Sequence, residues 1–315
     1  MLKITGLKKR YKKHQVLMGL DMALERGDVY GFLGTNGCGK TTTMNIICNI
    51  LAKDEGDISF DGQKIKIGYL PESPTLYGYM RGHEYLDYIG ACCDFLGDIR
   101  ARTYEVLSIT GMLPWAGNLI RGYSRGMNQR IGIAAAIYNS PDLLILDEPT
   151  SALDPSGRAE VMQTISNLAS TGSTIILCTH ILTDVERVAN KIGILKNGVM
   201  AVEGSMLDVK KNFSQDCVIN VCLQSYTSEY VDMLTNLELL SKSEVSDLSG
   251  ITLYAKEGVS ESELYTKVTE LLSRNNVIPE KIEFKRTTLE QIYLDVTGGL
   301  HTPDVYTPDG GGNNE

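Results

Sequence analysis

Eight residues near the N-terminus, Gly34-Thr35-Asn36-Gly37-Cys38-Gly39-Lys40-Thr41, constrain the fold more than any other part of the sequence. They match the pattern G-x-x-x-x-G-K-[ST], whose glycines let backbone N–H groups turn around a phosphate. An apolar run precedes them at 29–33, and apolar residues at helical spacing follow over 41–51. We therefore expect a strand, a phosphate-binding loop and a helix starting at about Lys40. Lys40 should reach the β- and γ-phosphates, and Thr41 should bind Mg²⁺.

A second apolar run, at 143–146, precedes two acidic residues, Asp147 and Glu148. Because four aliphatic residues come first, Asp147 is expected at the carboxyl edge of a sheet, where α/β proteins bind ligands. A helix N-cap is the alternative for Asp147. We predict that Asp147 is the second Mg²⁺ anchor. Glu148 points in another direction on a strand and is placed to polarise a water aimed at the γ-phosphate.

Strand-like and helix-like segments alternate up to about residue 205, which predicts an α/β domain with a largely parallel sheet. Further strands are expected at 174–178, 192–195 and 199–202, the last two joined by the turn residues Asn197-Gly198. The region from about 75 to 135 is mainly helical and is expected to form an insertion.

The sequence changes character after about residue 211. Expected strands at 218–223 and 251–255, with helices near 228–241 and 261–274, predict a small α+β domain over 215–298. The Pro-, Gly- and Asn-rich end, residues 300–315, is expected to be disordered.

Composition and charge argue against a nucleic-acid-binding, membrane-spanning or secreted protein. The net charge is −9, so no overall positive field favours nucleic acid, and the basic cluster at 8–13 is best explained as a solvated face. No segment approaches the run of about 18 apolar residues that a membrane helix needs, and the N-terminus has no signal-peptide core. Seven cysteines without a CxxC pair favour reduced thiols in a cytoplasm.

Four segments in fixed order carry a family resemblance: GTNGCGKTT, YSRGMNQR, LLILDEPTSALDP and Thr179-His180. Over about residues 1–212 the sequence resembles the ATP-binding subunit of ABC transporters. The short SRGM segment and the C-terminal extension look most like the exporter subgroup of multidrug, sodium and bacteriocin-immunity ATPases. The resemblance implies a P-loop NTPase fold with ATP and Mg²⁺ as cofactors. It also implies a dimer with a second ATP-binding subunit, expected to be a homodimer, and a separately encoded polytopic permease at the inner face of the cell membrane.

The resemblance also assigns roles outside the phosphate loop. Thr42 would contact the α-phosphate, and Tyr11 would stack on adenine, although an exposed tyrosine among lysines is the alternative. The signature turn, Ser124, Arg125, Gly126 and Met127, would close over the ATP of the partner subunit. A simple N-cap role for Ser124 is the alternative.

Three further residues take roles from the same resemblance. Ser151 and Asp154 belong to the loop that crosses between the two sites of the dimer. His180 directly follows a predicted strand and would contact the γ-phosphate and orient the attacking water. A structural histidine in the core is the alternative for His180.

One position departs from the family pattern. Family members commonly carry Gln where this sequence has Glu72, within the segment 68–74. A carboxylate can bind Mg²⁺ and accept a hydrogen bond from water, but it cannot donate as an amide does. We also predict that Cys38 is a reactive thiol, because Lys40 and a helix N-terminus lie beside it.

Two other function classes fit this sequence less well. Soluble ABC proteins that act on ribosomes or DNA usually carry two cassettes or long coiled coils, whereas this sequence has one P-loop and no sustained heptads. A nucleotide-binding regulator without turnover is disfavoured by the intact Asp147, Glu148 and His180. The transported substrate is specified by the permease, and the role of 215–298 is left open.

Overall fold

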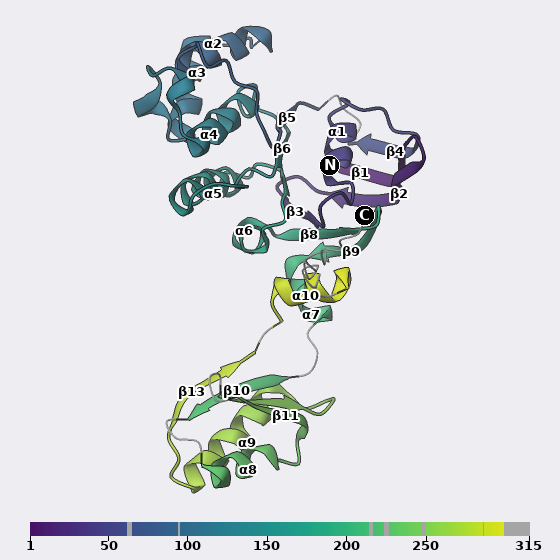
Figure 1. Cartoon of the computed structure of the whole chain (residues 1–315), viewed down its shortest axis with the longest axis vertical. Coiled ribbons are helices and arrows are strands. Elements are labelled where there is room, and N and C mark those ends of the chain that lie inside the picture. Colours follow the sequence, from purple (N-terminus) through teal and green to yellow (C-terminus); the bar gives the residue numbers. More distant parts are fainter. Residues whose placement is uncertain are drawn as a thin grey trace, which may run out of the picture. The chain divides into compact units, whose positions relative to one another are not determined.

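The structure, a computed structural model, describes residues 1–61, 65–93, 95–213, 217–223, 227–246, 250–285 and 287–298 (Figure 1). The chain forms two compact units. The first comprises Met1–Val209 together with residues 293–298, and the second comprises Lys210–Ile292.

A six-stranded sheet forms the centre of the first unit, in the order β5-β6-β7-β3-β8-β9. Its strands are β3 (Val29–Gly34), β5 (Ile67–Leu70), β6 (Leu143–Asp147), β7 (Ile175–Cys178), β8 (Lys191–Lys196) and β9 (Val199–Ser205). All neighbours are parallel except β8 and β9, which Asn197 and Gly198 join with positive φ angles of 49° and 76°. Every residue of β3, β6 and β7 is buried, as expected of parallel strands covered on both faces. The predicted parallel α/β core is confirmed.

A second, antiparallel sheet was not foreseen from the sequence. It has the order β2-β1-β4 and consists of β1 (Leu2–Tyr11), β2 (His14–Leu24) and β4 (Glu55–Phe60). Alternate side chains of β1 and β2 enter the core that also holds Tyr30 and Phe32 of β3. Within the basic cluster, Lys8 and Lys9 form ion pairs with Glu55 and Asp54, each at 2.7 Å.

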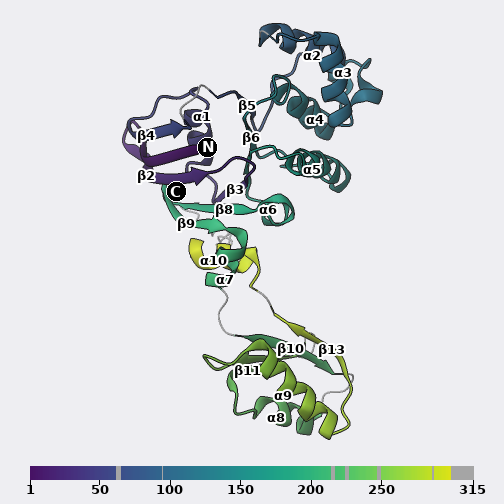
Figure 2. The ribbon, with the colours of Figure 1, turned by 180° about the vertical axis from the view of Figure 1, so that it is seen from behind.

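Helices complete the first unit. They are α1 (Lys40–Ile47), α2 (Gly82–Cys92), α3 (Ile99–Ile109), α4 (Arg125–Ala136), α5 (Pro155–Ser170), α6 (Leu182–Val188) and α7 (Met206–Asn212), with 3₁₀ turns η1 (Leu113–Trp115) and η2 (Ile120–Gly122). Helices α2, α3 and α4 lie together beyond β5 and β6 in both views (Figures 1 and 2), within the region expected to be a helical insertion. None of the described helices is long and apolar enough to cross a membrane.

The second unit has the element order β-α-β-β-α-β. It runs through β10 (Val218–Leu223), α8 (Ser228–Thr235), β11 (Leu240–Ser246), β12 (Gly250–Ala255), α9 (Glu261–Arg274) and β13 (Pro279–Phe284). Its antiparallel sheet has the order β11-β12-β10-β13, which is the ferredoxin-like arrangement. The helix expected to reach residue 241 ends at Thr235, and the alternating sequence that follows forms β11.

Helix α10 (Leu289–Thr297) leads the chain back to the first unit. Lys196 Nζ of β8 donates a hydrogen bond to the carbonyl of Val296 at 2.8 Å. The structure thus differs from the expected small domain at its end, because residues 293–298 group with the first unit. Residues 300–315 lie outside the described part of the chain, so their disorder stays a prediction.

Candidate functional site

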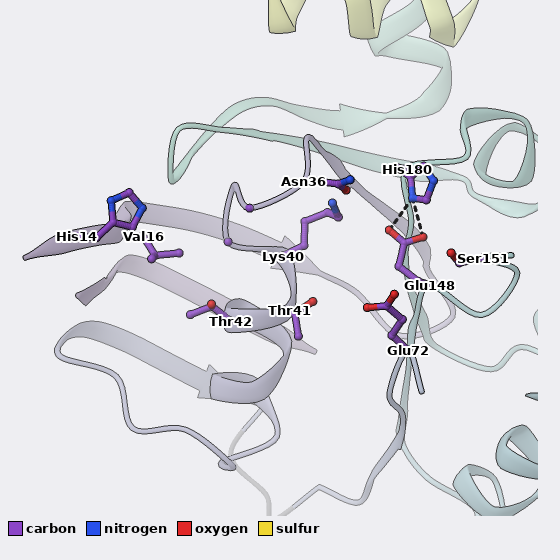
Figure 3. A pocket seen from close by; sticks show the side chains of 12 residues that line it. His14, Val16, Asn36, Lys40, Thr41, Thr42, Glu72, Glu148, Ser151 and His180 are labelled. Atoms are coloured by element: carbon purple, nitrogen blue, oxygen red, sulfur yellow. Dashed lines mark hydrogen bonds and ion pairs between the residues drawn. The ribbon is translucent and has the colours of Figure 1, made fainter. Parts of the chain in front are cut away.

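Four neighbouring strands end at one edge of the central sheet and place the predicted residues there. β3 leads into the phosphate loop, β6 into Glu148, β7 into His180 and β5 into Glu72. A cavity of about 500 Å³ opens at this edge (Figure 3). It is lined by His14, Val16, Asn36, Gly37, Gly39, Lys40, Thr41, Thr42, Glu72, Glu148, Ser151 and His180. Residues from distant parts of the sequence therefore face one space.

The phosphate loop needs its glycines for two reasons. Gly37 and Gly39 have φ angles of 78° and 115°, a region that other residues rarely adopt. A Cβ at Gly39 would also lie 2.7 Å from the Leu17 side chain. The backbone can therefore wrap closely around an anion.

Lys40 lies inside this loop and is only 7% exposed. Its ammonium donates to the carbonyl oxygens of Gly34 at 2.8 Å and Thr35 at 3.3 Å. Helix α1 begins here with Gly39 as N-cap and has neither a side-chain cap nor an acidic residue in its first turn. Its first N–H groups and its dipole are thus available to a phosphate.

Asp147 is the most unusual polar group at this edge. It is the last residue of β6, not a helix N-cap, and is 1% exposed. Neither carboxylate oxygen accepts a well-formed hydrogen bond, although the Cys178 thiol and the Thr41 hydroxyl lie near the carboxylate. Burial raises the pKa of Asp147, nearby Glu148 and Glu72 raise it further, and the neighbouring Cys178 thiol and Thr41 hydroxyl oppose this. A carboxylate in this environment is neutralised either by a proton or by a bound cation.

A magnesium ion fits these donors. Mg²⁺ prefers carboxylate, hydroxyl and phosphate oxygens, and Asp147 and Thr41 supply the first two. Glu72 lines the same cavity and can add a further oxygen. Within the described residues, no group of three or more His, Cys, Asp or Glu side chains could hold a metal unaided. The ion would therefore bind together with the nucleotide phosphates.

Glu148 and His180 form the polar pair at the centre of the cavity. His180 Nδ1 lies 3.0 Å from Oε1 and 2.9 Å from Oε2 of Glu148, and the Thr179 hydroxyl donates to Oε2 at 3.2 Å. The His180 side chain is 48% exposed, so the alternative of a core histidine is wrong. In Figure 3, Glu148 stands between His180 and Glu72. This arrangement can accept a proton from a water and orient that water.

The signature turn begins helix α4, and its residues also have roles within this chain. Ser124 is the N-cap, and its hydroxyl accepts from the Met127 N–H at 3.2 Å. At Gly126 a Cβ would lie 3.2 Å from the Cα of Gly157, so glycine allows α4 and α5 to approach closely. These residues, with Arg125, do not line the cavity. Their contact with a partner's ATP stays a prediction.

The two predicted residues of the loop after Glu148 differ in their positions within this chain. Ser151 lines the cavity, whereas Asp154 caps helix α5 by accepting from the Gly157 N–H at 3.3 Å. That cap explains Asp154 within a single chain. The dimer role of both residues stays a prediction.

The expected adenine contact lies at the β1–β2 turn. Tyr11 is 46% exposed, with the Lys9 ammonium 5.9 Å from its ring centre, and it does not line the cavity. Its cross-strand partner His14 does line it, together with Val16. Neither residue was predicted from the sequence, because no spacing pattern marks residues that reach a site from the second sheet. Stacking by Tyr11 stays a prediction.

The prediction of a reactive Cys38 is wrong. The thiol is only 8% exposed, and burial raises its pKa. Lys40 and the loop N–H groups lower the pKa of Cys38, but by less than burial raises it. A buried, protonated thiol is a poor nucleophile.

Comparison with known proteins decides the family. Residues 17–151 match the family model described as ABC transporter. Over 311 residues the chain is 30% identical to the linearmycin resistance ATP-binding protein LnrL of Bacillus subtilis, covering 95% of this chain and 98% of that protein. The chain belongs to the ABC transporter ATP-binding proteins.

Other members agree with this assignment. The daunorubicin resistance ATP-binding protein DrrA3 of Streptomyces coeruleorubidus is 30% identical over 306 residues, 94% of this chain and 95% of that protein. A solved dimer of the ATP-binding cassette MJ0796, in a post-hydrolysis state with ADP and phosphate, superposes with a TM-score of 0.59 at 25% identity, covering 65% of this chain and 99% of that one. The expected P-loop ABC ATPase fold is therefore confirmed. The protein is an ATP-binding subunit of the ABC transporter type.

Proposed function

We propose that this chain hydrolyses Mg·ATP as a dimer and thereby powers export through a separately encoded polytopic permease. The observation that carries the proposal is the cavity where the phosphate loop, the orphaned Asp147 and the Glu148–His180 pair meet. The resistance proteins LnrL and DrrA3, similar over nearly their whole length, favour export. A place at the inner face of the cell membrane follows from docking to a permease.

The chain's own residues divide the chemistry between binding and proton transfer. The loop N–H groups, Lys40 and the start of α1 hold the phosphates, and Thr42 contacts the α-phosphate. Bound Mg²⁺ would supply positive charge for the γ-phosphate, held by Thr41, Asp147 and Glu72. Glu148 accepts a proton from the attacking water, and His180 orients that water beside the γ-phosphate.

A second subunit completes each site in this proposal. Ser124 and the N–H groups at the start of α4 would donate to the γ-phosphate bound by the partner. The MJ0796 cassette, solved as a dimer with ADP and phosphate, supports this arrangement. The two chains of such a dimer are expected to be identical.

The permease would dock on an aromatic patch of the helical region that Tyr77, Tyr79 and Tyr88 form. Tyr77 contacts the rings of Tyr79 and Tyr88 at centre distances of 5.8 and 5.7 Å, and Tyr79 is 72% exposed. This aromatic patch follows Glu72 closely in the sequence, so a permease loop that covers it would sense that side of the ATP cavity. Tyr79→Ala should reduce co-purification with the permease and leave ATP binding intact. Tyr104→Ala, on α3 and 50% exposed, is the matched control.

Export is tested in cells. The chain is expressed with the permease encoded beside it in a sensitive host, which is challenged with linearmycin, daunorubicin and unrelated lipophilic compounds. Resistance that requires both genes, and that Glu148→Gln abolishes at equal protein level, is the expected result. Co-purification with ribosomes in place of a membrane protein would contradict the proposal.

A further inference from the structure

A buried acid lies behind the hydrolytic residues and has no part in the site described so far. Asp184 is 4% exposed and belongs to the first turn of α6, the helix that follows His180. Its Oδ2 accepts a hydrogen bond of 2.6 Å from the hydroxyl of Thr150, which is itself 2% exposed. The segment after His180 is thereby tied to the segment after Glu148.

Arg158 of α5 holds the other oxygen of the same carboxylate. Its Nε and Nη2 donate to Oδ1 of Asp184 at 2.9 and 2.8 Å, and Nη2 also donates to the Thr183 hydroxyl at 2.7 Å. These charge-assisted bonds offset the removal of the carboxylate from water. One acid therefore joins α5, α6 and the turn after Glu148.

The turn that Thr150 anchors has an unfavourable backbone. Glu148 and Ala152 have φ angles of 48° and 52°, in the left-handed region that residues with a Cβ rarely occupy. Such conformations persist only where the surroundings hold them. Thr150 lies between the two, and its hydroxyl is bonded to a buried side chain of another element. The Thr150–Asp184 hydrogen bond therefore lies where it can stabilise the unfavourable backbone of this turn.

We propose that Asp184 is a positioning residue for ATP hydrolysis: through Thr150 it holds the turn 148–152 so that Glu148 stays against His180. The inference rests on the proposed ATPase function. Its consequence is selective, because Lys40, Thr41 and the phosphate loop follow β3 and do not depend on this turn. Loss of the anchor should therefore lower turnover and leave ATP affinity nearly unchanged.

Three threonine variants separate this role from general stability. Thr150→Val keeps the shape and removes the donor, and should lower kcat about tenfold while KM for ATP changes by less than about twofold. Thr150→Ser restores the donor and should recover most of the rate. Thr164→Val is the matched control, since Thr164 is 5% exposed and its hydroxyl donates to the Glu160 carbonyl within α5, at 3.1 Å.

A mutant cycle with Glu148 tests the mechanism itself. If the anchor acts through Glu148, Thr150→Val should not lower the residual rate of Glu148→Gln further, so the two effects are not additive. Asp184→Asn, which still accepts from Thr150 but loses the charge opposite Arg158, serves if Thr150→Val does not fold, and should lower kcat about threefold with the same lack of additivity. Additive losses, or a loss of ATP affinity equal to the loss of kcat, would overturn the inference.

The wild-type protein separates the two proposals. If the wild type hydrolyses ATP, and Thr150→Val and Asp184→Asn have the same kcat as the wild type, only the positioning role is overturned. A wild type that binds no ATP, or binds it without turnover, overturns the proposed ATPase and the positioning role together.

Discussion

The two units differ in whether certain of their polar side chains have hydrogen-bond or ion-pair partners. At the carboxyl edge of the central sheet, Asp147 is buried without a hydrogen-bond partner and Glu148 has a strained backbone. On the four-stranded sheet of the second unit, polar side chains pair with one another: Lys242 with Glu244 and Lys281 with Glu283, each at 2.6 Å. In the described part of the second unit, no buried side-chain nitrogen or oxygen lacks a partner.

Unpartnered buried polar groups are typical of a ligand-binding site, whereas paired exposed groups are typical of an ordinary solvated surface. A buried polar group without a partner destabilises the fold, so it persists where a ligand completes it. Exposed ion pairs that satisfy each other need no ligand and contribute little to stability. The first unit should therefore respond strongly to single changes in charge, and the polar face of the second unit should respond weakly.

Glu148→Gln should have the largest effect. The amide keeps the shape but cannot take the proton of the attacking water, so turnover should fall about 10²-fold or more. ATP affinity should be retained, and an ATP-bound dimer should accumulate, visible by gel filtration with Mg·ATP.

Its control is Glu105→Gln, in which an exposed glutamate of α3 that does not line the cavity loses its charge. That variant should keep the wild-type rate. Wild-type turnover in Glu148→Gln would show that another group activates the water.

Asp147→Asn should act on stability and on magnesium dependence in opposite directions. Without nucleotide, removing an unpaired buried carboxylate should stabilise the first unit by about 1–3 kcal/mol. For a domain of this size that raises Tm by about 2–4 °C per kcal/mol. With Mg·ATP the wild type should gain more stability than the variant, because only the carboxylate binds the ion well. Differential scanning calorimetry with and without Mg·ATP measures both.

The stability difference between Asp147→Asn and the wild type should depend on pH. Burial raises the pKa of Asp147 in the folded state, so the folded protein holds this proton more tightly than the unfolded chain does. The destabilisation is therefore absent below the ordinary Asp pKa, grows as pH rises, and levels off above the raised pKa. The Tm advantage of Asp147→Asn should shrink as pH is lowered. An advantage independent of pH would mean that the carboxylate is not the cause.

Much of this site was predictable because local sequence carries it. The phosphate loop, Asp147 after four buried aliphatics and His180 after β7 are each marked by residues next to them in the chain. His14 and Val16 were not predictable, because they reach the cavity from the antiparallel sheet, whose register no local pattern specifies. Thr150 and Asp184 were missed for the same reason, since their bond joins two loops that only the fold brings together.

The fold shows the same limit. Segments with a clear period, such as α9 and β10, have the bounds expected from sequence. The helix expected over 228–241 was too long because Leu234, Leu237 and Leu240 recur at helical spacing, although α8 ends at Thr235 and β11 begins at Leu240. Cys38 was misjudged because its sequence neighbours favour a thiolate, whereas its burial, which sequence does not show, outweighs them.

Glu72 should have a moderate effect. If its oxygen serves as a magnesium and water contact, Glu72→Gln keeps the acceptor and should change turnover by less than about threefold, while Glu72→Ala should cost about tenfold. If the charge itself strengthens Mg²⁺ binding, the Gln variant should need more Mg²⁺ for half-maximal rate. Mg²⁺ titrations at fixed ATP distinguish these outcomes. Superimposable curves for all three proteins would remove Glu72 from the site.

The smallest effect is expected on the polar face of the second unit. Lys281 and Glu283 of β13 are both exposed and pair across one position of the strand, so Lys281→Ala exposes its partner to water and buries nothing unsatisfied. Tm and ATP turnover should both match the wild type. Burial alone should make the difference on this sheet: Val221→Ala, at a fully buried core position on the opposite face, should destabilise the second unit clearly. A loss of turnover in Lys281→Ala, with Tm unchanged, would reverse the comparison, because an exposed and self-paired residue would then be acting on the ATP site. In that case the polar face of the ferredoxin-like sheet would affect ATP hydrolysis, and a molecule that binds this face would have to recognise its charged side chains.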